Sequence, residues 1–234
     1  LRLVPALAGV TAAWPLFVGL LAVSAATMPL PFVRRRGRRR EWPAVLQWLG
    51  LLSMGWFSSL LLLTLARDAG LLLTWGAGAI AGTAIDWPRW QGVSALATVA
   101  AATAVSAVGF LNARRTAAVK RVEVPIEGLP AHLRGFTIAQ LSDIHVGPTI
   151  RQRYIQRIVD TVNGLGADMV AITGDLVDGS VPELREHIAP LAKLRTRHGT
   201  FVVTGNHEYY AGAHAWIDEL RRMGLRVLLN EHVV

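Results

Sequence analysis

In the second half of the sequence, three short polar motifs follow three apolar stretches, and this pattern limits the possible folds more than any other feature. The apolar stretches cover 136–141, 169–173 and 201–204, and each has the length and composition of a buried strand. The motifs that follow them recur about every thirty residues, the length of a strand-helix-strand unit. In order, they are Asp143-Ile144-His145, Gly174-Asp175-Leu176-Val177-Asp178 and Gly205-Asn206-His207-Glu208.

The segments between these stretches complete an alternating pattern, which predicts an α/β domain over 122–234. Helical periodicity predicts helices over 149–162, 182–194 and 213–223, and strands are expected over 122–126 and from Arg226 onward. If the strands are parallel, the motifs meet at one carboxyl edge, where open α/β sheets place their sites. The site is then expected to contain six polar residues, namely Asp143, His145, Asp175, Asp178, Asn206 and His207.

The side chains of these motifs are suited to binding metal ions. Carboxylate, imidazole and amide ligands without any cysteine favour manganese, iron, zinc or magnesium. Asp143 and His145 project to the same side of an extended chain and can chelate one ion. Asp175 can offer one oxygen to each of two ions, roughly 3.5–4 Å apart, and Asn206 can bind the second. The sequence therefore predicts two divalent or trivalent ions, with Mn, Fe or Zn favoured.

A simpler interpretation makes each aspartate a loop cap and each histidine a surface residue. That interpretation would suffice for a single Asp-x-His motif. Three motifs in order, each at the end of a strand, favour a shared site instead.

Together the motifs resemble those of the calcineurin-like metallophosphoesterase superfamily. Leu-Ser-Asp-Ile-His, Gly-Asp-Leu-Val-Asp-Gly and Thr-Gly-Asn-His-Glu-Tyr, after an apolar leader, are similar to bacterial membrane-linked metallophosphoesterases. The resemblance covers about 120–234 and implies a four-layer αββα fold. It implies these roles: Asp143 and His145 on the first metal, Asp175 bridging, Asn206 on the second metal, His207 near the leaving-group oxygen, Asp178 orienting His207, and Glu208 as a support rather than a ligand.

The sequence departs from the family pattern at its end. Family members complete the metal site with a downstream Gly-His-x-His motif, and this chain ends before one. Four other histidines lack that context and are expected on helix surfaces, turns or strands; they are His187, His198, His214 and His232. We therefore expect a fragment that holds about half of a two-metal site.

The first 111 residues have a different composition, which predicts a membrane region. They contain nine arginines, three acids, no histidine and seven of the eight tryptophans. Apolar stretches over 3–33, 42–66, 69–85 and 91–111 approach the roughly 20 residues needed to cross a bilayer. We expect about four membrane helices, with Pro15 kinking the first and Arg67-Asp68 separating the second from the third. A cleaved signal peptide is the alternative for the first stretch, but further apolar stretches follow it.

Basic residues around these stretches bear on sidedness. Arg34 to Arg40 contains six arginines and could be a nucleic-acid or localisation patch, but between apolar spans it fits a cytoplasmic loop better. Nucleic acid is therefore not expected as a partner, despite a pI of about 11.1. A basic linker is expected over 112–121. Four spans place the catalytic domain outside the cytoplasm and three spans place it inside; we expect a multi-pass protein with four.

The sequence thus predicts a membrane-anchored phosphoesterase that hydrolyses phosphate mono- or diesters with two metal ions. In this hypothesis hydroxide attacks phosphorus while His207 protonates the departing oxygen. The alternative is a non-catalytic receptor or scaffold that binds a phosphorylated ligand. A transporter is disfavoured because no span carries a charge at its centre. The sequence does not specify the phosphate ester, although the membrane anchor favours a membrane-proximal or lipid-derived one, and it does not specify the oligomeric state.

Overall fold

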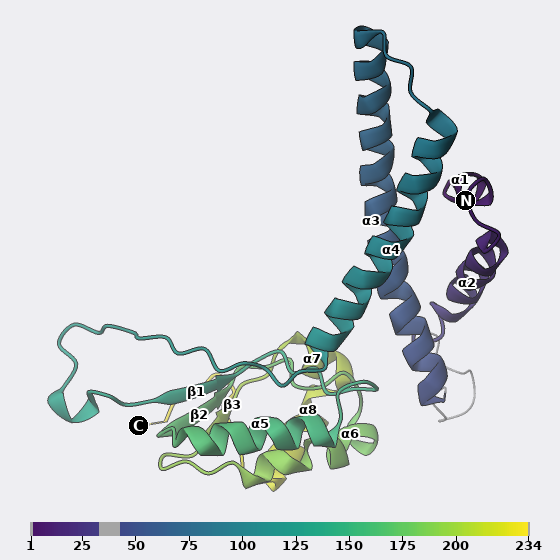
Figure 1. Ribbon diagram of the computed structural model, residues 1–234. Helices are drawn as coiled ribbons and strands as arrows, with labels where there is room; N and C mark the ends of the chain where they lie inside the picture. The colour runs from purple at the N-terminus through teal and green to yellow at the C-terminus, as the bar shows by residue number, and fades with distance from the viewer. Residues whose placement is uncertain (1, 33–42, 234) are drawn as a thin grey trace. The chain divides into compact units, whose positions relative to one another are not determined.

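The computed structural model of the chain describes residues 2–32 and 43–233 and divides into two compact units. The first covers Leu1–Arg115 and the second Thr116–Val234, and we call them the membrane unit and the catalytic unit after the roles expected from the sequence. The order of elements along the chain is shown in Figure 1. The arginine run at 34–40 lies outside the described residues, so the structure does not bear on the loop expected there.

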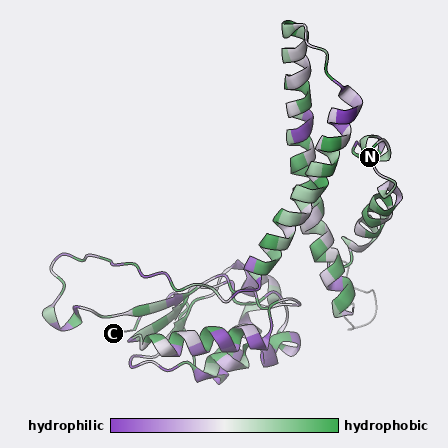
Figure 2. Ribbon diagram, viewed as in Figure 1, coloured by the Kyte–Doolittle hydropathy of each residue, from purple (hydrophilic) through white to green (hydrophobic). Residues whose placement is uncertain are grey.

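Two long helices, α3 (Ala44–Ala81) and α4 (Trp87–Ala113), dominate the membrane unit. They run antiparallel, because Trp48 near the start of α3 packs on Phe110 near the end of α4, with ring centroids 5.9 Å apart. Both are long and apolar enough to cross a membrane, and only 11% and 17% of their most apolar windows are buried. Hydrophobic residues surround both helices (Figure 2), as expected for lipid-facing helices rather than for the core helices of a soluble domain.

The expected break at Arg67 and Asp68 is wrong, because both residues lie within α3. Arg67 Nε donates to Ser94 Oγ at 2.9 Å, and its Nη2 donates to the carbonyl oxygen of Gln91 at 2.9 Å. Asp68 pairs with Arg2 at 3.1 Å. Since neighbouring segments satisfy both charges, the helix continues to Gly82, whose φ of +65° ends it. The second and third expected spans are therefore one helix.

The first expected span is also divided differently. It forms α1 (Val4–Ala8) and α2 (Trp14–Thr27), and the 14 residues of α2 are fewer than the roughly 20 that a bilayer requires. Pro15 lies in the first turn of α2, where a missing N–H costs nothing, so it starts a helix rather than kinking one.

The catalytic unit is built on a parallel sheet in the order β1-β2-β3-β4. The strands are β1 (Ile138–Leu141), β2 (Met169–Ile172), β3 (Thr200–Val202) and β4 (Arg226–Val227). The connecting helices are α5 (Gln152–Leu165), α6 (Val181–Ile188), α7 (Asn206–Ala211) and α8 (Ala213–Arg222), with short 3-10 helices η1 (Ala131–Leu133) and η2 (Ala189–Lys193). The strands are therefore parallel, which is the condition under which the motifs were expected to share one edge.

A single apolar core joins the sheet to α5, α6 and α8. Ile155 of α5, Ile188 of α6 and Trp216 of α8 are fully buried in it, together with Val170 and Val202 of the strands. Each helix presents its apolar stripe to the same face of the sheet. This packing holds the strands in register and brings their carboxyl ends to one edge.

Two predictions in this unit are wrong in detail. Residues 122–126 form no strand; they are extended and exposed without a neighbouring strand to pair with, so their alternation alone does not make a ladder. The helix expected over 182–194 ends at Ile188 and continues as η2. Pro190 explains the change, because its ring cannot donate a hydrogen bond and clashes with the preceding turn of an α-helix.

Candidate metal centre

The three motifs meet at the carboxyl edge of the sheet. The first motif follows β1 and the second follows β2, and their backbones pair beyond the strands. His145 N donates to the carbonyl oxygen of Asp175 at 3.0 Å, and Val146 bridges Val177 in parallel register. The third motif follows β3 and begins α7. The sheet therefore places all six expected residues in one region.

Three of these residues have left-handed backbone conformations, which non-glycine residues rarely adopt. The φ angles of Asp143, His145 and Asp175 are +54°, +52° and +53°. Asp, Asn and His tolerate this region better than other residues, yet each instance costs roughly 1–3 kcal/mol. Such strain persists where surrounding structure imposes it, and it is typical of binding and catalytic sites. The strained residues coincide with three of the four expected metal ligands.

Asp178 joins the two histidines of the site. Its Oδ1 lies 2.9 Å from His145 Nδ1 and 2.7 Å from His207 Nδ1, and the two rings are edge to face with centroids 4.4 Å apart. The pairing expected between Asp178 and His207 is therefore present, and the same oxygen also contacts His145, which the sequence did not indicate. Because Nδ1 of each ring faces Asp178, Nε2 is the nitrogen left for an ion or a substrate.

The pKa of the His145 imidazole is raised above its ordinary value. The hydrogen bond to Asp178 raises the pKa of the His145 imidazole, and the charges of Asp178, Asp175 and Asp143 add to this effect while burial opposes it. The negative charge around the ring is therefore large enough to outweigh its partial desolvation. A site with this excess of carboxylates attracts cations.

Asp175 lies between the second and third motifs. Its Oδ1 accepts from the backbone N–H of His207 at 3.0 Å. When its amide nitrogen is turned toward Asp175, Asn206 donates to the two carboxylate oxygens at 3.1 and 3.2 Å, and the amide oxygen then remains as a donor atom for an ion. Asp143 lies beside His145: its Oδ1 is 4.0 Å from His145 Nε2, and its carboxylate accepts a hydrogen bond from the Ser142 hydroxyl.

The donor atoms fit a metal ion. Ligand atoms of His145, Asp175 and His207 all lie within 4.8 Å of one another, and these residues are half-buried. Carboxylate and imidazole are the donors that first-row divalent ions take in proteins. This group contains two of the expected ligands together with His207, which the resemblance placed near the leaving group instead.

Glu208 is buried beneath the site and ties two motifs together. Its side chain is only 2% exposed. Its carboxylate accepts four backbone hydrogen bonds, from Asp175, Leu176, Val177 and Gly205, at 3.0, 2.7, 3.2 and 2.7 Å. The supporting position expected for Glu208 agrees with these contacts. The number of N–H groups that converge on it could not be read from the sequence.

Two glycines allow the second and third motifs to approach so closely. A Cβ at Gly174 would lie 2.5 Å from the nitrogen of Gly205, and a Cβ at Gly205 would lie 2.3 Å from Asp175 Oδ1. Gly174 also has a φ of +91°. Sequence reasoning identified Gly174 as a turn residue but missed Gly205, although its place between a strand and Asn206 was a usable signal.

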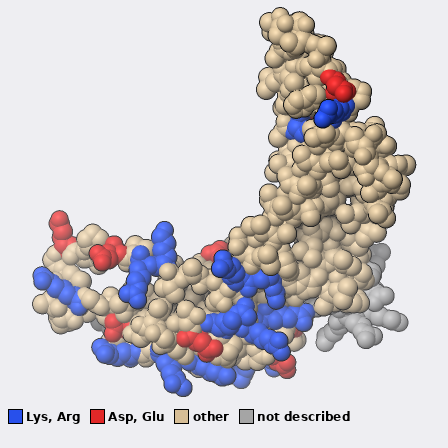
Figure 3. All heavy atoms as spheres, viewed as in Figure 1, with Lys and Arg blue, Asp and Glu red and all other residues tan. Residues whose placement is uncertain are grey.

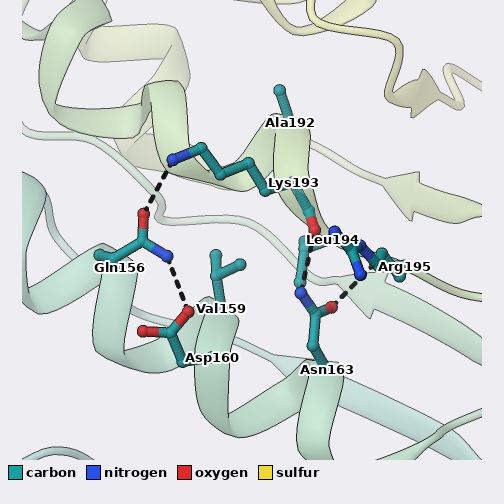
Figure 4. A pocket seen from close by; sticks show the side chains of 8 residues that line it. All are labelled: Gln156, Val159, Asp160, Asn163, Ala192, Lys193, Leu194 and Arg195. Atoms are coloured by element: carbon teal, nitrogen blue, oxygen red, sulfur yellow. Dashed lines mark hydrogen bonds between the residues drawn. The ribbon is translucent and has the colours of Figure 1, made fainter.

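A hollow of the catalytic unit lies away from the three motifs. It is a groove of about 390 Å³ between α5 and the segment after η2 (Figure 4). Polar side chains that line it already have hydrogen-bond partners: Asn163 donates to the Lys193 carbonyl and accepts from the Arg195 backbone N–H, and Lys193 Nζ donates to the Gln156 side chain. None of the motif residues lines this groove, so it is not the site.

Comparison with known proteins agrees with the motifs. Residues 136–231 match the family model described as calcineurin-like phosphoesterase. The chain is 46% identical over 132 residues to the zebrafish (Danio rerio) protein named "Transmembrane protein with metallophosphoesterase domain", covering 56% of this chain and 30% of that protein. Its counterpart in cattle (Bos taurus) is 41% identical over 163 residues, which cover 69% of this chain and 36% of that protein.

A bacterial relative has a named reaction. The UDP-2,3-diacylglucosamine pyrophosphatase of Chlamydia trachomatis is 32% identical over 82 residues, 34% of this chain and 24% of that protein. The chain thus spans about a third or less of the length of these relatives. No solved structure matches the chain.

Proposed function

Because residues 136–231 belong to the calcineurin-like phosphoesterase family, we propose that this chain is part of a membrane-anchored enzyme that hydrolyses phosphate mono- or diesters with two metal ions. The observation that carries the proposal is the left-handed backbone at Asp143, His145 and Asp175. A scaffold that only held its fold would gain nothing from this strain, whereas a metal site uses it to aim ligands. The strain thus favours catalysis or metal binding over the scaffold alternative.

The roles follow the contacts of each side chain. Asp143 and His145 would hold the first ion, Asn206 would hold the second through its amide oxygen, and Asp175 would contact both. When bound, the ions supply Lewis acidity and an activated water. His207 presents Nε2 to the leaving-group oxygen and gives it a proton. Asp178 orients both imidazole rings through its Oδ1.

The four-layer fold implied by the resemblance is supported by an open sheet face. In the described part of the catalytic unit, Ile138 and Val203 are 55% and 41% exposed on the side away from α5, α6 and α8. Parallel sheets are normally covered on both faces. We therefore propose that a second sheet covers this face in the whole protein.

The continuity of α3 changes the expected sidedness. The six arginines of 34–40 directly precede α3 in sequence, and Arg114, Arg115, Lys120 and Arg121 follow α4. Because α3 and α4 are antiparallel, and Arg114 lies 5.3 Å from the ring of Trp48, the start of α3 and the end of α4 lie at the same end of the helix pair. From the positive-inside rule we propose that the catalytic unit lies in the cytoplasm. The expectation of an extracytoplasmic catalytic unit assumed that Arg67 and Asp68 separate two membrane spans, whereas α3 is one continuous helix.

The substrate class proposed is a phosphate ester of a membrane lipid or lipid precursor. The Chlamydia relative is named for a diacylated sugar nucleotide, and the membrane unit keeps the catalytic unit close to such molecules. A soluble phosphate ester is the competing substrate.

The direct test uses the full-length protein in detergent or nanodiscs, stripped of metal and then given Mn²⁺. We expect hydrolysis of an aryl phosphate mono- or diester to appear only with metal. A fully metal-loaded protein that turns over neither aryl esters nor lipid phosphates would favour the non-catalytic receptor.

A second experiment tests on which side of the membrane the catalytic unit lies. Protease added to spheroplasts should leave the catalytic unit intact until the membrane is permeabilised; digestion in intact spheroplasts would place the unit outside.

A further inference from the structure

Helix α5 carries two arginines on its exposed side, one turn apart. Arg153 and Arg157 are four residues apart and exposed, while Ile155 and Ile158 between and beside them enter the core. Arg157 Nε donates to Thr116 Oγ1 at 2.9 Å, and the guanidinium lies 5.5 Å from the centre of the Tyr154 ring. This contact fastens the first residue of the catalytic unit to α5.

Thr116 is close along the chain to the membrane helices. Helix α4 ends at Ala113, three residues earlier, and three residues span at most roughly 10 Å. The end of α4 has the features of a membrane interface, with Phe110 against Trp48 and a following run of polar residues. Covalent connection alone therefore keeps Thr116 near the bilayer surface, at any angle between the two units.

Four basic residues of the catalytic unit near this connection form no ion pair in the described part of the chain. Among the described residues, no carboxylate forms an ion pair with Lys120, Arg121, Arg153 or Arg157. The nearest acid along α5, Asp160, accepts from Gln156 at 2.8 Å. Basic side chains gather over the part of the unit that contains α5 (Figure 3).

Three other arginines of the catalytic unit are each paired with an acid. Arg197 lies 3.4 Å from Asp168, Arg221 lies 3.8 Å from Glu231, and Arg222 pairs with Glu219 within α8. Lys120, Arg121, Arg153 and Arg157 differ from these three arginines, because no described acid forms an ion pair with them.

We propose that Lys120, Arg121, Arg153 and Arg157, here called the α5–linker surface, bind the anionic headgroups of the bilayer that holds α3 and α4. Guanidinium groups match phosphate oxygens in charge and geometry, and polybasic segments beside membrane helices are attracted to anionic leaflets. The inference rests on the proposed membrane insertion and not on phosphoesterase activity. Because α5 follows the first motif directly, the bound state brings the start of α5 and the metal-binding edge toward lipid.

A fluorescence experiment on the full-length protein tests the proposal. The sequence given contains no cysteine, so Gln152→Cys introduces one labelling site at the start of α5 once any cysteine beyond it is removed. Energy transfer to a headgroup-labelled lipid is measured in nanodiscs of phosphatidylcholine alone and with about 30% phosphatidylglycerol. We expect stronger transfer in the anionic discs, and release as NaCl rises to about 0.5 M.

Matched variants separate charge from structure. Each base contributes roughly fivefold to binding at an anionic surface, so Arg153→Gln with Arg157→Gln should reduce the docking equilibrium about 25-fold. Arg197→Gln removes a paired arginine and should leave transfer unchanged. Thr116→Val removes the hydrogen bond to Arg157 without changing charge, and it should retain the lipid dependence.

Three outcomes would overturn the proposal: equal transfer in both lipids, no response to salt, or a double variant that behaves as Arg197→Gln does. The salt titration uses the chain without these substitutions, so it decides the matter even if the double variant fails to fold. Displacement of the surface from anionic discs by a short RNA duplex at low concentration would point to nucleic acid instead. Because no turnover is measured, a failure here leaves the phosphoesterase proposal untouched, and the reverse also holds.

Discussion

Both units of this protein bring charged groups together, but they do so in opposite ways. In the membrane unit, Arg67 and Asp68 have partners of opposite charge or polarity, and α3 stays helical through them. At the carboxyl edge of the catalytic sheet, Asp143, Asp175 and Asp178 gather around two histidines. Two of these aspartates have left-handed backbones.

The contrast distinguishes charged residues that stabilise the fold from charged residues that are arranged to bind a cation. A paired cluster is complete within the chain, so its removal should lower stability alone. A cluster of like charges held by strained backbone is incomplete, because its carboxylates repel one another until a cation arrives. The predictions below test this division, starting with the largest expected effect.

Asp175→Asn in the full-length protein should lower turnover of an aryl phosphate ester by several orders of magnitude, because one charge is expected to hold both ions. Its control is Asp160→Asn, which removes an acid of α5 outside the site and should leave activity unchanged. Turnover within tenfold of the unmodified enzyme, with metal content intact, would refute the two-metal proposal.

His207→Ala should slow hydrolysis roughly a hundredfold while leaving metal content near normal, the scale expected for loss of a general acid. The loss should shrink for substrates whose leaving group needs no proton. His214→Ala, on the surface of α8, is the control. If metal content falls with activity, His207 acts as a ligand, as its place in the donor group also allows.

Glu208→Gln should weaken metal binding about 10- to 100-fold. The NH2 group of the glutamine would face the backbone N–H groups of Asp175 and Leu176, so the hydrogen bonds that hold Asp175 in position would be lost. Stability of the catalytic unit should also fall by about 1–3 kcal/mol. Glu186→Gln, on the exposed side of α6, should change neither. Unchanged metal affinity measured by titration would mean that Glu208 supports the fold alone.

Arg67→Met should have the smallest effect on chemistry. It removes two hydrogen bonds between α3 and α4, so thermal unfolding in nanodiscs should show a loss of about 1–3 kcal/mol. Hydrolysis at saturating substrate should stay within about twofold, since the cluster has no part in catalysis. A tenfold loss of turnover with the fold intact would show that the two kinds of charge cluster are not separate.

Much of the catalytic unit followed from its sequence. Apolar stretches before Asp143, Asp175 and Asn206 predicted strands, and the interval between the motifs predicted a shared edge if those strands were parallel, as they are. Those signals are local, and they depend on periods that hydrophobic burial imposes. The contact of Asp178 with both histidines and the four N–H groups on Glu208 depend on how separate loops meet, so no local pattern revealed them.

The membrane unit shows where composition misleads. Arg67-Asp68 looks like a loop in sequence, because an uncompensated charge would end a membrane helix. Ser94, Gln91 and Arg2 compensate both charges from distant positions in the chain. The strand predicted over 122–126 was wrong for a related reason. Its apolar and polar residues alternate as in a strand, but a strand also needs a neighbouring strand to pair with.

The central claim is that the carboxylates at the sheet edge are arranged for cations. Metal analysis of the full-length protein, after chelation and dialysis against excess Mn²⁺, tests it most directly, with Asp175→Asn and Asp160→Asn measured in parallel. We expect two Mn²⁺ per chain in the unmodified protein and in Asp160→Asn, and less than one in Asp175→Asn. Absence of bound metal, or equal metal content in all three proteins, would contradict the claim.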